Sequence, residues 1–232
     1  SALDAPVRIT AETDIDADMM PIGGRLRVDV GPGQVTVADE PVRLVGGVFA
    51  IAATGTDATI ETAELTVLGS EKSTPTRLRL TGALRHEEAK LSVAGTLTLN
   101  EVAFADLPRL WPTRASAVTR AWIVENIPSG TARDGRVEIA LRMSSDFSDL
   151  AVTHLQGMLD GEDLTVHWLR PVPPLEKGQA QLRFLDPDRI EITMSSARQK
   201  AGARGGWLNA GNGRMLITGM TVKDQFATIE AD

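Results

Sequence analysis

The 232-residue sequence lacks several features that would define a class of function. It contains no cysteine, which excludes disulfides and thiolate metal sites and fits either the cytoplasm or a periplasm. It contains no tyrosine, and aromatic residues make up only 4% of the chain, so the apolar content is mainly aliphatic. No apolar run reaches the roughly 18 residues of a membrane-spanning helix, and the first residues do not resemble a signal peptide. We therefore expect no transmembrane segment here, and we interpret the sequence as a mature or excised segment.

The sequence also lacks an excess of positive charge. It has 31 acidic against 24 basic residues, for a formal net charge of −7. A negative net charge opposes the release of counterions that drives nucleic-acid binding, so we expect no nucleic-acid partner. Hydrophobic residues make up 42% of the chain, which is ordinary for a protein that forms a core. The length suits one large all-β domain or two small ones.

What the sequence does contain is alternation of apolar and polar residues with a period of two. The clearest run covers residues 91–99, where Leu91, Val93, Leu97 and Leu99 alternate with small polar residues and alanine. This pattern predicts antiparallel strands with one apolar and one solvated face. Similar alternation and turn signals recur along the chain, with turns expected at 31–33, 55–57, 69–75, 186–188 and 212–213.

Residues 107–141 hold the only convincing long helix pattern. The helix is predicted to begin at Thr113 and to end before Pro128, and residues 107–111 are predicted to form a short docked loop. We expect the helix to cover an exposed edge or end of the sheet, or the seam between two sheet units. The predicted organisation is a first β-sheet unit at 1–106, a loop and helix connector at 107–130, and a second β-sheet unit at 131–232.

The two halves carry a weak internal similarity. The segment that begins at Gln34 resembles the one that begins at Asp163, and each predicts a strand, a proline-containing connection, a strand, a tight turn and a strand. Two alternating segments also align by coincidence, so true repetition is one of two interpretations. Repeats that pair edge to edge would form one long continuous sheet.

The sequence contains no convincing catalytic or metal-binding motif. The three histidines lie in unrelated contexts, and we interpret them as surface or strand histidines: His86, His154 and His167. The acidic run at 14–18 begins like a calcium loop, but Met19 and Arg25 stand where that loop needs glycine and glutamate. No nucleophile elbow or dinucleotide-binding turn is present. We therefore predict that the chain is not an enzyme and uses no cofactor or metal.

A basic, glycine-rich stretch lies near the end of the chain. It holds Arg198, Lys200, Arg204 and Arg214, and no acidic residue occurs between Thr193 and Val222. Such a stretch either contacts phosphates or forms a mobile solvated loop.

Four strings in the centre of the chain are distinctive: LPRLWP at 107–112, AWIVENIPSG at 121–130, GRVEIAL at 135–141 and LDGEDLTVHWLRPVPPLEKGQAQLRF at 159–184. Together they resemble the AsmA-like family, in particular its large YhdP-type members in bacterial envelopes. The resemblance covers residues 107–219 well and the first hundred residues only by their strand pattern. No invariant catalytic motif defines the family.

The resemblance implies an elongated, curved antiparallel β-sheet, shaped like a taco, with a hydrophobic groove that binds lipid acyl chains. It implies a role in phospholipid transport between the inner and outer membranes, and so in outer membrane biogenesis. The implied partners are phospholipid or another acyl-chain lipid and the rest of a larger membrane-anchored chain. The implied location is the periplasm, with the full-length protein tethered to the inner membrane. This segment would be one part of a lipid conduit.

The predicted groove lining consists of the apolar members of the alternating strands. These residues are Val35, Val37, Leu78, Leu80, Leu91, Val93, Leu97, Leu99, Val137, Ile139, Leu141, Leu164 and Val166. The same alternation is also typical of a closed β-sandwich, in which two apolar faces pack on each other. That alternative predicts a structural or interaction module of a large envelope protein, without a ligand.

Overall fold

The computed structural model describes residues 3–37, 40–55, 57–87, 90–111, 117–144, 151–201, 205–222 and 226–231. The first half contains the strands β1 (Leu3–Asp4), β2 (Val7–Ile15), β3 (Pro21–Val30), β4 (Gly33–Val37), β5 (Glu40–Thr54), β6 (Asp57–Leu68), β7 (Thr76–Glu87) and β8 (Lys90–Ala103). The 3-10 helix η1 (Phe104–Asp106) and the α-helices α1 (Leu107–Leu110) and α2 (Ala117–Asn126) follow. The second half contains β9 (Ser129–Ser144), β10 (Ala151–Val166), β11 (Leu175–Asp186), β12 (Arg189–Lys200), β13 (Trp207–Ala210), β14 (Gly213–Thr218) and β15 (Phe226–Ala231).

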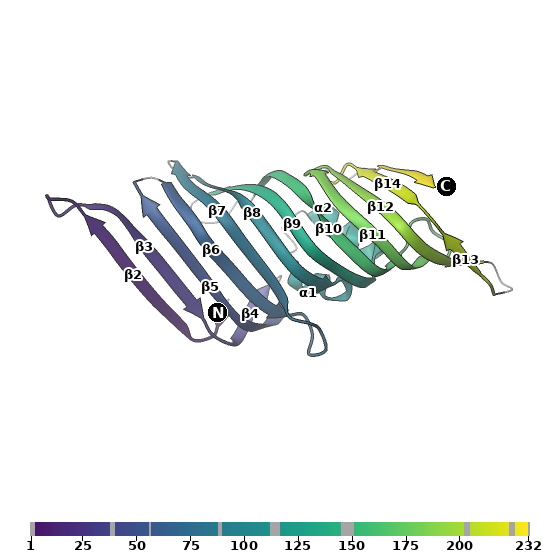
Figure 1. Cartoon of the computed structure of the whole chain (residues 1–232), viewed down its shortest axis with the longest axis horizontal. Coiled ribbons are helices and arrows are strands. Elements are labelled where there is room, and N and C mark those ends of the chain that lie inside the picture. Colours follow the sequence, from purple (N-terminus) through teal and green to yellow (C-terminus); the bar gives the residue numbers. More distant parts are fainter. Residues whose placement is uncertain are drawn as a thin grey trace.

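All these strands belong to one antiparallel sheet in which most neighbours in sequence are also neighbours in space (Figure 1). The long strand β5 pairs with β4 through its first residues and with β3 through residues 47–54. In the same way, β12 pairs with β14 through 190–194 and with β13 through 197–200. The predicted class, a mainly β, elongated, curved antiparallel sheet, is confirmed. Because the described strands form one sheet, two sheets do not face each other as in a closed sandwich.

The two halves are joined by direct pairing of β8 with β9. The ladder runs from Lys90 opposite Ser144 to Ala103 opposite Thr131, so the sheet continues without a break across the predicted connector. The strand order predicted for both similar segments is present. It occurs as β4, β5 and β6 in the first half and as the end of β10, β11 and β12 in the second.

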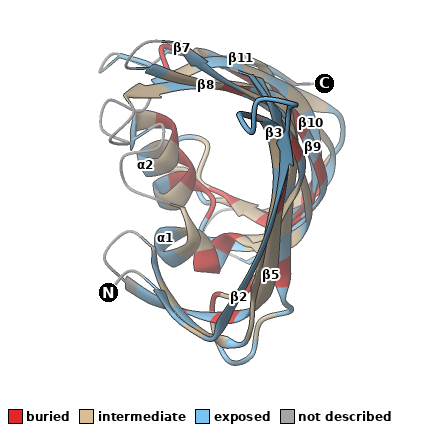
Figure 2. Ribbon diagram, turned by 90° about the vertical axis from the view of Figure 1, so that its left-hand side faces the viewer, coloured by how far each residue is buried: buried red, intermediate tan, exposed pale blue. Residues whose placement is uncertain are grey.

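The sheet has two chemically different faces. Residues directly opposite each other on neighbouring strands lie on the same face. Leu80 is opposite Leu97, which is opposite Val137, whereas Thr81 is opposite Thr96 on the other face. Viewed along the long axis, the sheet is curved like a letter C, with both α-helices on its inner side (Figure 2). We call the inner, apolar side the concave face and the outer side the convex face.

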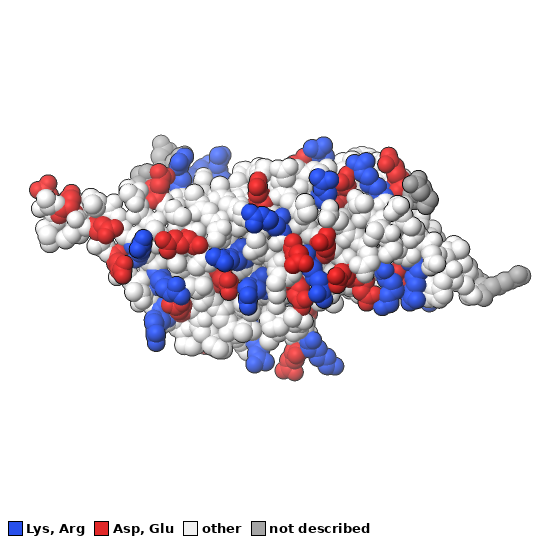
Figure 3. Space-filling view, in the orientation of Figure 1, with Lys and Arg blue, Asp and Glu red and all other residues white. Residues whose placement is uncertain are grey.

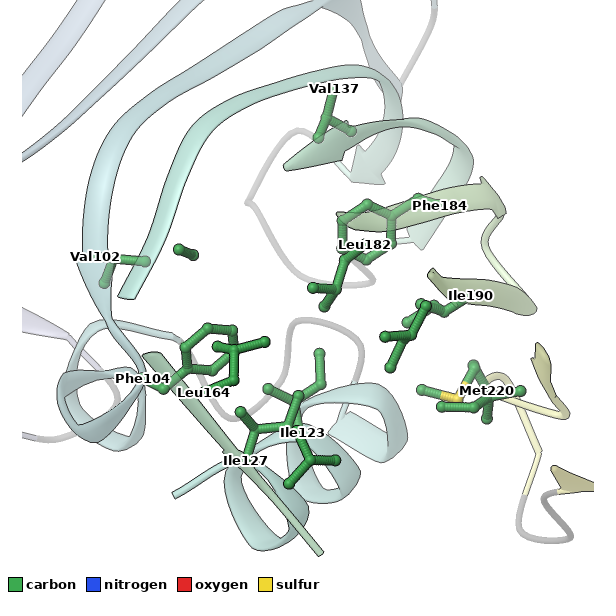
Figure 4. Close-up of a cluster of buried hydrophobic side chains, with 14 residues drawn as sticks. Val102, Phe104, Ile123, Ile127, Val137, Leu164, Leu182, Phe184, Ile190 and Met220 are labelled. Atoms are coloured by element: carbon green, nitrogen blue, oxygen red, sulfur yellow. The ribbon is translucent and has the colours of Figure 1, made fainter. Parts of the chain in front are cut away.

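The connector lies on the concave face of the second half of the sheet. Ile123 of α2 and Ile127, which directly follows this helix, point at strand residues such as Leu164 and Leu182 (Figure 4). The buried cluster extends from Val102 of β8 to strand β14. The prediction that the helix covers an edge of the sheet is therefore wrong. The alternative, that it covers the seam between the halves, agrees with part of the cluster, which holds Val102 of β8 and Val137 of β9 and extends on to β14. The apolar stripe of a helix and the apolar face of a sheet both need burial, and packing them together satisfies both.

The start of the connector also differs from the prediction. Residues 107–110 form the one-turn helix α1 and not a loop. The helix α2 is described from Ala117, so its predicted start at Thr113 lies outside the described residues.

Hydrogen bonds fix the connector to the β6–β7 loop. The buried carboxylate of Asp106 accepts a hydrogen bond from Ser73 Oγ at 2.5 Å, and this hydroxyl also lies 2.6 Å from Ser70 Oγ. Arg109 Nη1 donates to the carbonyl of Gly69 at 3.2 Å. A Cβ at Gly69 would collide with the Asp106 side chain, so the close approach depends on glycine here.

Candidate functional site: the concave face

Nine of the thirteen predicted lining residues lie together on the concave face of β7, β8 and β9. The register places Leu78 opposite Leu99, Leu80 opposite Leu97, and Val93 opposite Leu141. The complete set is Leu78, Leu80, Leu91, Val93, Leu97, Leu99, Val137, Ile139 and Leu141. Val93 and Val137 are buried, and the other seven are half-buried. The alternation alone therefore identified a continuous apolar area over three strands.

The other four predicted residues lie elsewhere. Leu164 is 0% exposed and Val166 is also buried, because both pack in the core beneath the connector. Val35 packs against the small buried cluster of Val42, Leu44 and Val67. The side chain of Val37 lies outside the described residues. Leu164 and Val166 therefore offer no free surface, and we assign them to the packed core.

The same face continues over strands that the predicted lining did not include. Ile9 of β2 is opposite Val28 of β3, and Val28 is opposite Phe49 of β5. Leu65 of β6 is opposite Leu78, which connects this area with the predicted one. The alternation at residues 26–30 was the available signal. Only the register shows that these residues and the β7–β9 leucines share a face.

The uncovered part of the concave face lies in the first half of the sheet. Among the described elements, no helix or second sheet packs on β2, on residues 21–29 of β3 or on residues 47–54 of β5 (Figure 2). Val30 at the end of β3 packs against the small cluster of Val42, Leu44 and Val67. Only α1 approaches β5, where Leu110 packs beside Leu44 at the opposite end of the strand. Ile9 is 66% exposed, and Leu26, Phe49 and Leu80 are half-buried. We call the concave side of β2, β3 and β5–β8 the open face.

The size of the open face can be derived from strand geometry. Neighbouring strands are about 4.8 Å apart, so the five steps from β2 to β8 span about 24 Å. The hydrocarbon core of a bilayer is about 30 Å thick, which leaves about 15 Å for the acyl chains of one leaflet. An acyl chain laid across the strands would therefore fit within the open face.

Charge is concentrated on the convex face, where Lys and Arg alternate with Asp and Glu (Figure 3). Cross-strand ion pairs lie along it: Arg77 with Glu64 at 3.6 Å, Arg85 with Asp57 at 2.9 Å, Arg133 with Glu162 at 3.0 Å, and Arg183 with Glu191 at 3.3 Å. A hydrogen bond from Arg27 lowers the pKa of the Asp29 carboxyl below its ordinary value. The pairs of Arg77, Arg85 and Arg133 are exposed and contribute little stability each, so their main effect is to keep this face solvated. Glu191 differs because it is buried, 7% exposed, between Arg183 and Arg214.

The three histidines and the acidic run at 14–18, which were considered as sites of chemistry, lie in ordinary positions on strands, turns and loops. His86 and His154 are exposed on strands, and the backbone N–H of His167 donates to the carbonyl of Asn126 at 2.8 Å. Asp16 Oδ1 accepts the backbone N–H groups of Asp18 and Met20, as in an ordinary turn. Within the described residues, no three His, Cys, Asp or Glu side chains are grouped so that they could hold a metal ion.

No helix in the described part of the chain is long and apolar enough to cross a membrane. Comparisons of the sequence with protein-family models, with curated proteins and with solved structures give no match. The AsmA-like resemblance and the role it implies therefore stay predictions.

Proposed function

We propose that the open face binds the acyl chains of lipids, and that the chain is a segment of an AsmA-like protein of the bacterial envelope. In this proposal the full-length protein is tethered to the inner membrane and carries phospholipid across the periplasm. The observation that carries the proposal is an apolar sheet face over six strands with no described second layer on its first strands. A sheet in a soluble domain normally buries such a face against another element.

The energetics support acyl chains as the ligand. Burying one methylene is worth about 0.8 kcal/mol, so covering half of a sixteen-carbon chain would contribute roughly 6 kcal/mol without any polar contact. The open face is built from aliphatic residues such as Leu26, Leu80 and Leu97, and Phe49 is the one large aromatic side chain among the concave residues named for β2, β3 and β5–β8. A phosphate headgroup would stay in water at the open side of the C-shaped sheet.

The proposal can be tested with one pair of neighbouring substitutions. Leu80→Asp places a charge on the open face, and Thr81→Asp places the same charge on the convex face of the same strand. We expect the parent protein, purified without detergent, to carry lipid in native mass spectra. Leu80→Asp should lose it, and Thr81→Asp should retain it. A parent protein without lipid, or equal retention in both variants, would contradict the proposal.

The covered half of the sheet favours a second candidate function. Its concave face is packed with buried side chains such as Leu182 and Ile190, as in a structural or interaction module without a ligand. If the parent protein is folded and monomeric but neither carries nor takes up lipid, this second function is the better account.

A further inference from the structure

The β12–β13 hairpin forms a protruding corner of the molecule (Figure 1). Strand β13 pairs only with the last residues of β12, from Lys200 opposite Trp207 to Ala197 opposite Ala210. A backbone hydrogen bond of 2.8 Å from Ala201 N to the Gly206 carbonyl helps close it. The described part of this hairpin therefore has a defined shape.

Two large apolar side chains are exposed on this hairpin. Trp207 is 45% exposed and Leu208 is 57% exposed, and as neighbours on one strand they lie on opposite faces. The Arg198 guanidinium lies 4.2 Å from the centroid of the Trp207 ring, and the Lys200 ammonium lies 5.7 Å from it. The hairpin thus combines an indole, an aliphatic side chain and two cations within a few residues.

The charge of this region is opposite to that of the whole chain. Residues 192–223 contain five basic and no acidic residues, which leaves 19 basic against 31 acidic residues elsewhere. Two of the five form ion pairs in the fold, Arg214 with Glu191 and Arg198 with Glu176 at 4.0 Å. Arg204 and Lys223 lie outside the described residues, so Lys200 is the described cation that carries the local charge. A local positive charge on an acidic protein favours an anionic partner.

A second hairpin with exposed apolar side chains, at the β2–β3 turn, differs from the β12–β13 hairpin in the charge around it. The β2–β3 turn exposes Met19 and Met20, but it is surrounded by Asp14, Asp16 and Asp18. An anionic surface would repel that turn and attract the β12–β13 hairpin. Tryptophan with neighbouring Lys and Arg is also the combination found at the interface between membrane and water.

We propose that the β12–β13 hairpin docks on the surface of an anionic lipid bilayer. Trp207 and Leu208 enter the interface, while Lys200 lies at the level of the lipid phosphates. Arg198, 4.2 Å from the centroid of the Trp207 ring and 4.0 Å from Glu176, positions the indole. This contact does not rest on acyl-chain binding by the open face, because it uses different residues at the far end of the sheet.

The test is co-sedimentation of the intact chain with vesicles of phosphatidylcholine alone and of phosphatidylcholine mixed with phosphatidylglycerol. We expect binding only to the mixed vesicles. Trp207→Ala should weaken it at least about tenfold, because the ring carries most of the inserted apolar area. Lys200→Gln should weaken it about fivefold, as expected for one cation near an anionic surface.

Matched controls are Met20→Ala at the acidic hairpin and Lys72→Gln in the exposed β6–β7 loop, which should both bind like the parent. Lipid retained in native mass spectra should be unchanged in Trp207→Ala, which separates this contact from the open face. Equal binding to both kinds of vesicle would overturn the proposal. Equal binding by parent and Trp207→Ala would also overturn it.

Discussion

The two halves of the sheet share one pattern of alternation but differ in what covers it. In the second half, Leu182 is 1% exposed because α2 and its flanking turns pack on the concave face. In the first half, Leu80 occupies an equivalent inward position and is only half-buried, and Ile9 near the sheet edge is mostly exposed. The apolar face is thus a core in one half and an accessible surface in the other.

This difference shows that an alternating strand specifies which face is apolar but not whether that face is covered. The cover comes from one short connector, and α2 has only ten residues. It reaches the strands β8 to β14 and leaves β2 and β3 without a second layer. Four substitutions can test the comparison, from the largest expected effect to the smallest.

The largest effect is expected from Leu182→Asp in the covered half. The substitution places an unpaired carboxylate in a buried apolar cluster, which should lower the free energy of unfolding by at least about 4 kcal/mol. Chemical denaturation followed by circular dichroism measures it. A loss below about 1 kcal/mol would mean that water reaches this cluster, and the two halves would then not differ as described.

A weaker packing of the connector on the sheet is expected from Ile127→Ala, directly after α2. Ile127 is 1% exposed, and removing most of its side chain beneath the connector should cost about 3 kcal/mol. The half-buried Val118 of α2 provides the control, since Val118→Ala should cost clearly less. Hydrogen exchange should show faster exchange in β10–β12 and no change in β2 and β3. Equal changes in both halves would contradict the separation.

A smaller effect with a defined pH dependence is expected from Asp188. Its carboxylate accepts hydrogen bonds from Thr221 Oγ1 at 2.6 Å, from Thr221 N at 3.1 Å and from Gly219 N at 3.2 Å. These bonds place Met220, which is 2% exposed, in the core of the covered half. Asp188→Ala should therefore cost about 2 kcal/mol at neutral pH.

The sign of the pH dependence follows from the pKa of Asp188, which its hydrogen bonds to Thr221 and Gly219 lower. The stabilisation is complete above the ordinary carboxyl pKa of about 3.9 and is lost as the pH falls through the lowered value. Denaturation curves of parent and variant should therefore converge in strong acid. Asp18→Asn on the exposed β2–β3 turn serves as control, and a constant difference down to acid pH would refute the assignment.

The smallest effect on stability is expected from Leu80→Asp in the open half. At a half-buried position that water reaches, the carboxylate should cost about 1 kcal/mol, close to the cost of Thr81→Asp beside it. The thermal midpoint of each variant measures this. Unfolding of Leu80→Asp, with Thr81→Asp intact, would show that the open face is a dry core.

The strands and their apolar faces could be predicted because the alternation of apolar and polar residues is a property of the local sequence. Leu78, Leu80, Leu97 and Leu99 were assigned to one face, and the register confirms that they share it. The burial of Leu164 and Val166 could not be predicted, because they alternate in the same way. Their difference from Leu80 is created by α2, which lies about 40 residues earlier in the sequence than Leu164.

The position of the connector was the main error, and its cause is physical. The sequence of α2 and the residue after it shows an apolar stripe with Ile123 and Ile127, but a stripe does not specify its partner surface. The bond between Asp106 and Ser73 that holds the connector joins residues 33 apart. Such pairings between distant polar residues leave no periodic signal in the sequence.

The central claim is that acyl chains bind the open face and not the covered half. The most direct measurement is labelling of the unmodified protein with a photoreactive fatty acid, followed by peptide mapping. The account predicts adducts on concave residues of β3 and β5–β8, such as Leu80 and Leu97, with few on Thr81 and none in β11 or β12. Labelling spread equally over both faces, or concentrated in β11 and β12, would contradict it.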